Sequence, residues 1–378
     1  MEAYDDDYVP AGFALNNVGA ICHFNALMQG LASCPSLVKS VIDNRDYMAK
    51  TATGGALYNF MRAVELSSKA VRDGGDFIVD ATHSLRVLQA LIGDLCKRRP
   101  KTRFTTGMES ATEGLVLLLD MVEHPSEVAS APEDETAAST TDAAATVGQW
   151  DNPIARLFQM RIRDRVWCKL CAEDDKAKAA AETAASGTAS EIAVDSPKNP
   201  PGVVSLRLDT MYQYNYFHFD TTDKVTTPHA FASHLLKQVN ALSGFKCEKC
   251  AAAGRKVPAP RTAFRLYEMR LIPPILVVLF NQYQGHRQRY FPQRFRVEGA
   301  NKGVWLRYRQ VAQIEHSGNL HSGHYWTRGL RRVQTIVGPA VQPHLLNDSQ
   351  VSPGQGLMPT PSVYTVIYHY DGDEGPEE

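Results

Sequence analysis

Two pairs of cysteines with the spacing Cys-X-X-Cys constrain this chain more than any other feature. One pair is Cys168 and Cys171, and the other is Cys247 and Cys250, with residues 172–246 between them. Each pair is able to place two thiolates on one metal ion, and two pairs complete the closed tetrahedral shell that structural zinc prefers. Two unrelated pairs or a redox pair are the alternative, but no strand–helix–strand pattern of a redox domain surrounds either one. We therefore predict a structural zinc site, which requires the two segments to meet.

The rest of the sequence indicates a reducing compartment for these cysteines. The opening residues, MEAYDDDYVP, are acidic and lack the features of a secretory signal or a transit peptide. The most apolar run, residues 271–280, is too short to span a bilayer and contains two prolines. We expect a protein of the cytoplasm, the nucleus or both, in which the seven cysteines serve metal binding or catalysis rather than disulfides.

The composition indicates a folded chain without a general affinity for nucleic acid or membranes. Of the 378 residues, 44% are hydrophobic, which suffices for a sizeable core. The 40 basic and 41 acidic residues nearly cancel, whereas a nucleic-acid or membrane-surface binder carries a basic excess. Two segments differ from the rest: residues 126–146 are acidic without a basic residue, and residues 172–202 are rich in Ala and then in Pro. Both are typical of solvated insertions.

The remaining segments change from helical to strand-like patterns along the chain. The spacing of apolar residues predicts three helices, over residues 22–33, 109–122 and 228–242. From residue 261 onward, short β-branched and aromatic runs predict strands, including residues 275–280 and 364–370. Helices first and strands last indicate the α+β class.

Cys22 differs from the other cysteines by its position. It opens the predicted helix 22–33, and a helix N-terminus stabilises the thiolate, which is the reactive form of cysteine. Gly19 lets the backbone turn ahead of it. The amide of Asn17 is able to donate a hydrogen bond beside the thiol, where an oxyanion would form. On this pattern alone, a packing role for Cys22 is the commoner alternative.

Two later segments supply the partners that a cysteine nucleophile needs. His324 lies at the end of the glycine-containing segment 316–325, and a neutral imidazole there is able to take the thiol proton and return it to a leaving amine. Asn347 and Asp348 follow an apolar pair, and either side chain is able to accept from the imidazole N–H and fix its tautomer. A solvated histidine and an ordinary turn are the alternatives for these two segments.

Taken together, these motifs resemble the ubiquitin-specific proteases, a family of cysteine deubiquitinases. The stretch GFALNNVGAICHFNALMQGL, residues 12–31, resembles the cysteine box of that family, and HSGNLHSGHYWTRG, residues 316–329, resembles its histidine box. The stretch LLNDSQV, residues 345–351, is similar to the segment that carries the third catalytic residue. The boxes and the cysteine pairs follow one another in the order of the family, and the resemblance spans about residues 12–372.

The resemblance implies an α+β, papain-like cysteine protease fold with a thumb, a palm and fingers that hold the four-cysteine zinc site. It divides the chain into an acidic N-terminal tail, a catalytic domain and a second acidic tail, at residues 1–11, 12–372 and 373–378. Within the domain, the thumb, the fingers and the palm would span about residues 12–150, 151–260 and 261–372.

The resemblance also implies a thiol-dependent isopeptidase that acts on ubiquitin and ubiquitinated proteins, and we expect a monomer. Cys22 would be the nucleophile and His324 the general base. Asn347 would orient the imidazole, with Asp348 as a second polar partner, and Asn17 would supply the oxyanion hole. The candidate substrate-binding residues are Glu113, Gly323 and Tyr325.

Three departures from the family pattern leave alternatives open. Ile21 stands before the nucleophile in place of threonine, and His23 follows it in place of an aromatic residue. Ser110 stands where the family has an aspartate, which together with a glutamate at the position of Glu113 resembles a clamp for arginines of the ubiquitin tail. A catalytically silent ubiquitin-binding scaffold and a protease for a ubiquitin-like modifier are therefore the alternatives.

Overall fold

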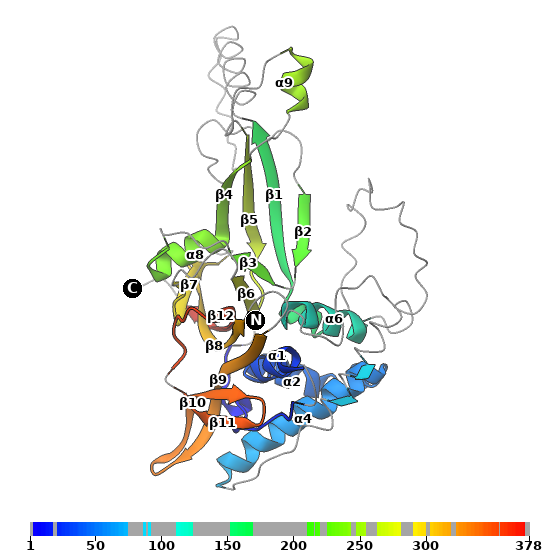
Figure 1. Ribbon diagram of the computed structural model, residues 1–378, viewed down its shortest axis with the longest axis vertical. Helices are drawn as coiled ribbons and strands as arrows, with labels where there is room; N and C mark the ends of the chain where they lie inside the picture. Colours follow the sequence, from blue (N-terminus) through cyan, green and yellow to red (C-terminus); the bar gives the residue numbers. More distant parts are fainter. Residues whose placement is uncertain are drawn as a thin grey trace. The chain divides into compact units, whose positions relative to one another are not determined.

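The chain divides into two units, seen in a computed structural model (Figure 1). The first unit comprises Met1–Gln159, Asn215–Ala232 and Pro273–Glu378, and the second comprises Met160–Tyr214 and Ser233–Ile272. The described residues are 3–17, 21–74, 86–87, 90–91, 111–123, 152–168, 210–214, 216–219, 225–242, 247–254, 263–280, 290–299, 303–318, 323–354 and 356–374. The predicted insertions, 126–146 and 172–202, lie outside these ranges, as do Cys171 and Ser110.

The helices of the first unit surround a central one that is buried along its whole length. They are η1 (Asp6–Tyr8), α1 (Cys22–Ala32), α2 (Pro35–Asp43), α3 (Arg45–Met48), α4 (Ala52–Arg72), α6 (Ala111–Glu123) and η4 (Ala155–Leu157). Every residue of α1 is buried, as expected for a helix that other elements cover on all sides. Pro35 occupies the first turn of α2 and so separates it from α1. The predicted helices at 22–33 and 109–122 correspond to α1 and α6.

An eight-stranded sheet forms the rest of the first unit, in the order β11-β10-β9-β8-β12-β6-β3, with β7 paired to β8. Its strands are β3 (Phe217–Phe219), β6 (Ile275–Phe280), β7 (Arg294–Glu298), β8 (Trp305–Gly318), β9 (Gly323–Thr335), β10 (Gly338–Asn347), β11 (Gln350–Pro353) and β12 (Val363–Glu374). The strands predicted at 275–280 and 364–370 are β6 and the larger part of β12. The prediction of a fold with both helices and sheet is confirmed.

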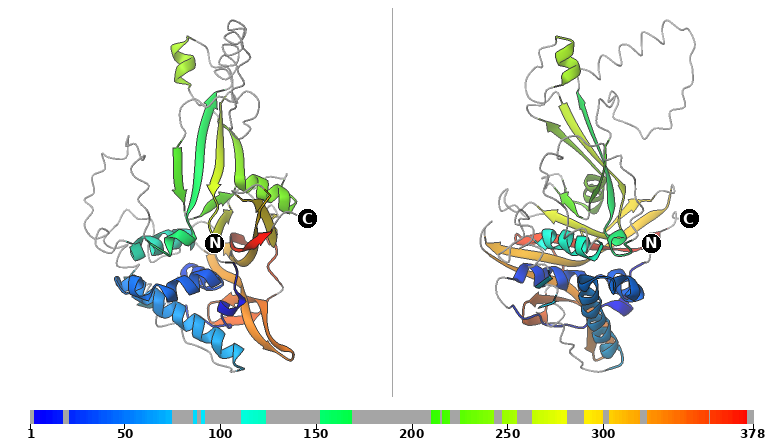
Figure 2. Two further views of the ribbon diagram at one scale, coloured as in Figure 1. Left: turned by 180° about the vertical axis from the view of Figure 1, so that it is seen from behind. Right: turned by 90° about the vertical axis from the view of Figure 1, so that its right-hand side faces the viewer.

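Polar as well as apolar contacts join α1 to the sheet, on the side where α2 and α4 also lie (Figure 2). The hydroxyl of Thr327 on β9 donates to the carbonyl of Ala26 on α1 at 2.6 Å. Arg331 on β9 is fully buried and donates to the side chains of Ser33 and Gln29. Burial lowers the pKa of this guanidinium to about 9. These bonds fix both the distance and the register between the helix and the strand.

Residues 3–17 run along the first unit before α1 begins. Val9 and Leu15 are fully buried, and Ala11 forms a bridge with Arg332 on β9. The backbone N–H of Leu15 donates to the carbonyl of Asp348 at 3.0 Å. The segment therefore connects the start of the described chain to the end of β10, where two of the predicted site residues lie.

The second unit is a four-stranded antiparallel sheet in the order β2-β1-β5-β4, with the short helix α9 (Glu248–Ala252). Its strands are β1 (Met160–Cys168), β2 (Thr210–Tyr214), β4 (Lys237–Leu242) and β5 (Ala263–Leu271). β1 and β5 pair along almost their whole length, up to Cys168 opposite Ala263.

The prediction of one helix over residues 228–242 is wrong in its second half. The helix, α8 (Pro228–Leu236), begins as expected, since Thr227 accepts from the backbone N–H of Ala230 at 3.1 Å. From Lys237 onward the chain is strand β4, which pairs with β5. Val239, which the helical pattern placed in the core, is 49% exposed. Pairing with a strand that lies later in the sequence overrides a local pattern of this kind.

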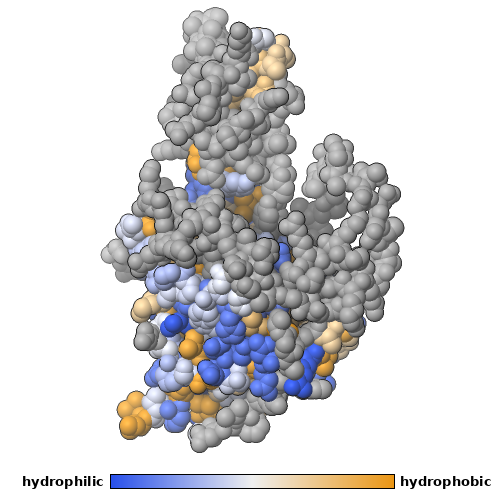
Figure 3. All heavy atoms as spheres, in the orientation of Figure 1, coloured by the Kyte–Doolittle hydropathy of each residue, from blue (hydrophilic) through white to orange (hydrophobic). Residues whose placement is uncertain are grey.

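Ile336 and Val337 are the most exposed large apolar residues among those that the structure describes, and they form the turn between β9 and β10. Figure 3 shows apolar atoms at the tip of this hairpin. None of the described helices combines the length and the apolar character that crossing a membrane demands.

Candidate active site

Cys22 is the first residue of α1, and its side chain is buried. Burial raises the pKa of the Cys22 thiol above its ordinary value. A backbone hydrogen bond from Tyr325 lowers this pKa, and the Asp348 carboxylate raises it again. The net direction is opposite to the one expected from a helix N-terminus alone, because the loss of water around the sulfur outweighs the backbone donors. A buried thiol of this kind needs a base to ionise it.

His324 and Asn347 come together at the ends of two paired strands. His324 lies near the start of β9, and Asn347 is the last residue of β10, which pairs with β9 up to Leu346 opposite Thr327. The Nε2 atom of His324 lies 2.6 Å from Oδ1 of Asn347. Because an amide oxygen only accepts, this bond places the proton on Nε2 and leaves Nδ1 as the basic nitrogen. The bond to Asn347 therefore fixes the tautomer in which Nδ1 is free to accept a proton.

Asp348 joins the turn after β10 to the segment around Cys22. One carboxylate oxygen, Oδ2, accepts from Nδ2 of Asn17 at 2.9 Å, and Oδ1 accepts from Nδ2 of Asn25 at 2.7 Å. Its distance to His324 Nε2 is 3.9 Å, which is beyond a hydrogen bond. Asp348 also has a positive φ of 50°, which aspartate tolerates better than most residues. The carboxylate thus contacts the candidate oxyanion donor rather than the imidazole.

Asn17 is oriented from both ends of its amide. Its Oδ1 atom accepts from the backbone N–H of Ile21 at 3.4 Å, while Nδ2 donates to Asp348. An amide nitrogen carries two hydrogens, so one N–H remains after the bond to Asp348. This arrangement suits a donor to an oxyanion that forms beside Cys22.

Asn25 is a site residue that the sequence analysis missed. It lies three positions after Cys22 on α1, so both side chains share one face of the helix. It is also buried, and its only visible signal in the sequence is a polar residue within an otherwise apolar helix segment.

Gly323 and Tyr325 flank the imidazole and have different roles in the packing. A Cβ atom on Gly323 would lie 2.3 Å from Nε2 of His316 and 2.4 Å from the carbonyl oxygen of Ser317, so only glycine fits. The ring of Tyr325 is buried between His316, with ring centroids 4.3 Å apart, and Tyr364, at 5.5 Å. The backbone of Tyr325 forms a hydrogen bond with the Cys22 thiol, and its ring packs in the hydrophobic core of the first unit.

Glu113 lies on α6, beside Tyr216. Burial raises the pKa of the Tyr216 phenol, and the negative charge of Glu113 adds to this effect. The neighbouring position of interest, Ser110, is outside the described residues.

Three of the four predicted metal ligands come together in the second unit. The Sγ atoms of Cys168, Cys247 and Cys250 all lie within 4.8 Å of one another, and all three residues are buried. Cys168 and Cys250 have their sulfur atoms 3.7 Å apart. Thiolates at about 2.3 Å from a tetrahedral zinc ion are separated by about 3.8 Å, so this group fits zinc. Cys171, the fourth predicted ligand, lies outside the described residues.

The sequence matches a protein family described as ubiquitin carboxyl-terminal hydrolase over residues 13–368. The chain belongs to this family. Its members are cysteine-type ubiquitin hydrolases, so the protein is a deubiquitinase and the predicted family, enzyme class and activity are confirmed. A search of curated protein sequences gives no significant match.

Solved structures of deubiquitinase modules have the same fold as this hydrolase. One is the SAGA DUB module of a Ubp8 variant with Sgf11, Sus1 and Sgf73 bound to monoubiquitin, with TM-score 0.59, 14% identity, and coverage of 98% of this chain and 71% of that chain. The same module bound to ubiquitin aldehyde gives TM-score 0.55, 14% identity and coverages of 98% and 71%. A yeast module with a variant Sgf73 gives 0.57, 13% identity and coverages of 98% and 70%.

Proposed function

We propose that this deubiquitinase cleaves the isopeptide bond between the C-terminal glycine of ubiquitin and a lysine, with Cys22 as the nucleophile. The observation that carries the proposal is the bond of 2.6 Å between His324 and Asn347 in the unit that also buries Cys22 next to the backbone of Tyr325. A thiol, an oriented imidazole that is able to take its proton, and an amide donor are the groups that acyl transfer to cysteine requires.

The reaction begins with transfer of the Cys22 proton to Nδ1 of His324. The sulfur then forms a bond to the carbonyl carbon of the glycine, and the carbonyl oxygen becomes an oxyanion. As the carbon–nitrogen bond breaks, the imidazolium donates its proton to the leaving lysine amine, which gives a thioester on Cys22. Water then attacks the thioester with His324 as base, and ubiquitin leaves as a carboxylate while the thiol is restored.

Asn347 and Asp348 each orient one group of the site, His324 and Asn17 respectively. Asn347 accepts from Nε2 of His324 and keeps the ring in place through both proton transfers. Asp348 holds Asn17, whose second N–H donates to the oxyanion. Asn25 in turn fixes the Asp348 carboxylate from α1. Gly323 would contact the substrate tail through its backbone, because its missing side chain makes room for His316 and Ser317, and Glu113 on α6 binds a basic residue of that tail.

We also propose a structural zinc ion on Cys168, Cys171, Cys247 and Cys250. The convergence of three buried thiols supports this site, and a closed thiolate shell has no position for a reacting water. Zinc would stabilise the second unit, and none of the catalytic steps depends on it.

Ubiquitin is the proposed partner of this chain, and two of the related modules are bound to ubiquitin or its aldehyde. The expectation of a monomer gains no support, since the related Ubp8 chains are in modules with Sgf11, Sus1 and Sgf73. Residence in the cytoplasm or the nucleus stays a prediction. No observation favours the silent scaffold or the protease for a ubiquitin-like modifier.

The test is a reaction with ubiquitin that carries a C-terminal electrophile, followed by intact mass. We expect a one-to-one adduct with the unchanged protein and none with Cys22→Ala. Cys34→Ala is the matched control, because Cys34 is a buried cysteine that directly precedes α2 and has no proposed role. An adduct that persists in Cys22→Ala would refute the assignment of the nucleophile.

A further inference from the structure

The outer edge of the large sheet carries two pairs of arginines that face each other across neighbouring strands. In the register of β7 and β8, Arg294 lies opposite Arg309, and Arg296 lies opposite Arg307. Residues that are directly opposite in an antiparallel pair share one face of the sheet. The four side chains, here called the arginine quartet, therefore lie on the same face. The alternate residues of the strands, Phe295, Val297 and Tyr308, are buried on the other face.

Like charges directly opposite each other destabilise a pair of strands, so the arginine quartet requires negative charge nearby. Residues at the end of β12 supply part of this charge. Arg296 pairs with Glu374 at 3.4 Å, and Arg309 lies 3.8 Å from a carboxylate oxygen of Asp371. Arg307 donates to the backbone carbonyl of Asp371. Ion pairs thus reach two of the four guanidinium groups, and Arg294 has none with any carboxylate that the structure describes.

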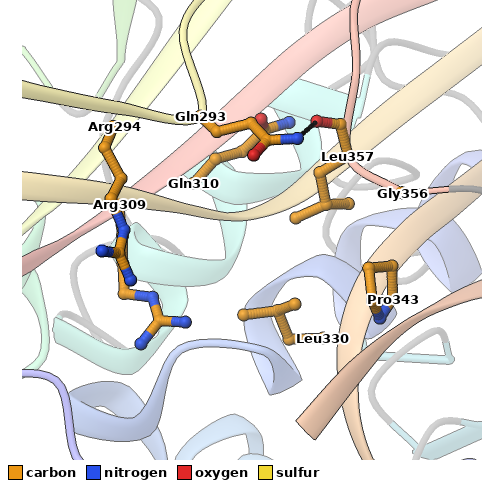
Figure 4. A pocket seen from close by; sticks show the side chains of 8 residues that line it. All are labelled: Gln293, Arg294, Arg309, Gln310, Leu330, Pro343, Gly356 and Leu357. Carbon is orange, nitrogen blue, oxygen red and sulfur yellow. Dashed lines mark hydrogen bonds between the residues drawn. The ribbon is translucent and has the colours of Figure 1, made fainter.

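A pocket of about 400 Å³ opens beside two members of the quartet, in the size range of ligand sites. Figure 4 shows the guanidinium groups of Arg294 and Arg309 on one side of the pocket. Leu330, Leu357 and Pro343 line it farther from these two groups. The pocket thus combines a cationic side with an apolar side.

We propose that this pocket binds an acidic peptide segment of a partner protein. Its carboxylates would pair with Arg294 and Arg309, and an apolar side chain would contact Leu330 and Leu357. A nucleic-acid backbone fits less well, because it offers no apolar side chain to Leu330, Pro343 and Leu357. The proposal concerns recognition of a partner and is independent of the catalytic assignments.

The test measures binding of a fluorescein-labelled peptide of Glu and Asp residues around one Leu, by fluorescence anisotropy with the full-length protein. We expect binding that weakens with added salt, and at least about tenfold weaker binding to Arg294→Glu, since the substitution removes a charged hydrogen bond and adds a like charge. The matched control is Arg270→Glu, which reverses the charge of another exposed strand arginine, in the second unit, and should bind like the unchanged protein.

Two further measurements distinguish the proposal from non-specific electrostatic binding of the peptide. The same peptide with Gln and Asn in place of its acidic residues should not bind, and hydrolysis of a ubiquitin–fluorophore substrate by Arg294→Glu should remain unchanged, which shows that the variant is folded. An equal loss of peptide binding in Arg294→Glu and Arg270→Glu would overturn the proposal, and so would binding of the neutral peptide. Tighter binding of a labelled single-stranded oligonucleotide that is lost in Arg294→Glu would assign the quartet to nucleic acid instead.

Discussion

The candidate active site and the cysteine cluster are assembled in different ways. In the first unit, groups from three separate regions meet through side-chain hydrogen bonds, such as Asn17 to Asp348 at 2.9 Å and His324 to Asn347 at 2.6 Å. In the second unit, three buried thiols meet at the end of one pair of strands and beside one short helix. The geometry of the first site depends on packing across the whole unit, whereas the geometry of the second depends mainly on the cysteines that form it. Substitutions in the first site should therefore mainly lower activity, and substitutions in the second should mainly lower stability.

The largest expected effect on catalysis comes from His324→Ala. Removing the base leaves the Cys22 thiol protonated, and we expect a loss of about ten-thousand-fold or more in kcat/KM. Hydrolysis of a ubiquitin–fluorophore substrate measures the loss, and the thermal midpoint should stay unchanged because the ring is partly exposed. A loss below about tenfold would show that another group is the base.

A smaller loss is expected for Asp348→Ala, which removes the acceptor that orients Asn17. Loss of one oxyanion donor typically costs about one hundred- to one thousand-fold in kcat, and we expect a loss in this range. The matched variant is Asn25→Ala, which leaves Asp348 in place but removes one of the two hydrogen bonds to its carboxylate and should cost less. If Asn25→Ala were the more damaging of the two, Asp348 would not act through Asn17.

Cys250→Ser should have the opposite signature, with a small effect on the chemistry and a large one on stability. Loss of a thiolate ligand weakens zinc binding, and the binding free energy of a structural zinc ion is free energy of folding. We expect less bound zinc by elemental analysis and a lower thermal midpoint, while Cys22 still reacts with the ubiquitin electrophile. Unchanged zinc content would contradict the proposed ligand set.

The smallest expected effect is a shift in the pH dependence of Cys22 alkylation by a small neutral reagent. Burial raises the pKa of this thiol, so the thiolate fraction and the rate should still be rising with pH where an exposed cysteine has levelled off. Asp348→Asn removes a negative charge that also raises this pKa, so the midpoint should move to lower pH while ubiquitin hydrolysis falls. A midpoint that moved upward would place Asp348 outside the electrostatic reach of Cys22.

The sequence located those parts of the molecule where the chemistry follows from residue type and order. Cys22 at the start of a helix, the glycine-flanked His324 and the two spaced cysteine pairs carry their signal locally. β4 was missed because its apolar spacing also fits a helix, and only pairing with β5 decides between them. Asn25 was missed because a buried polar residue has meaning only once its partner, Asp348, is placed beside it. The arginine quartet likewise depends on the register of β7 and β8.

The bond between Asn17 and Asp348 joins residues that are 331 positions apart. A ribosome makes about 5–20 residues per second, so α1 emerges many seconds before β9 and β10. Contacts between such distant positions form late and slowly, because a long loop must close first. The nascent chain would therefore expose Cys22 without its imidazole for much of its synthesis. The enzyme would be inert toward ubiquitin on its own ribosome until the last strands have joined the sheet.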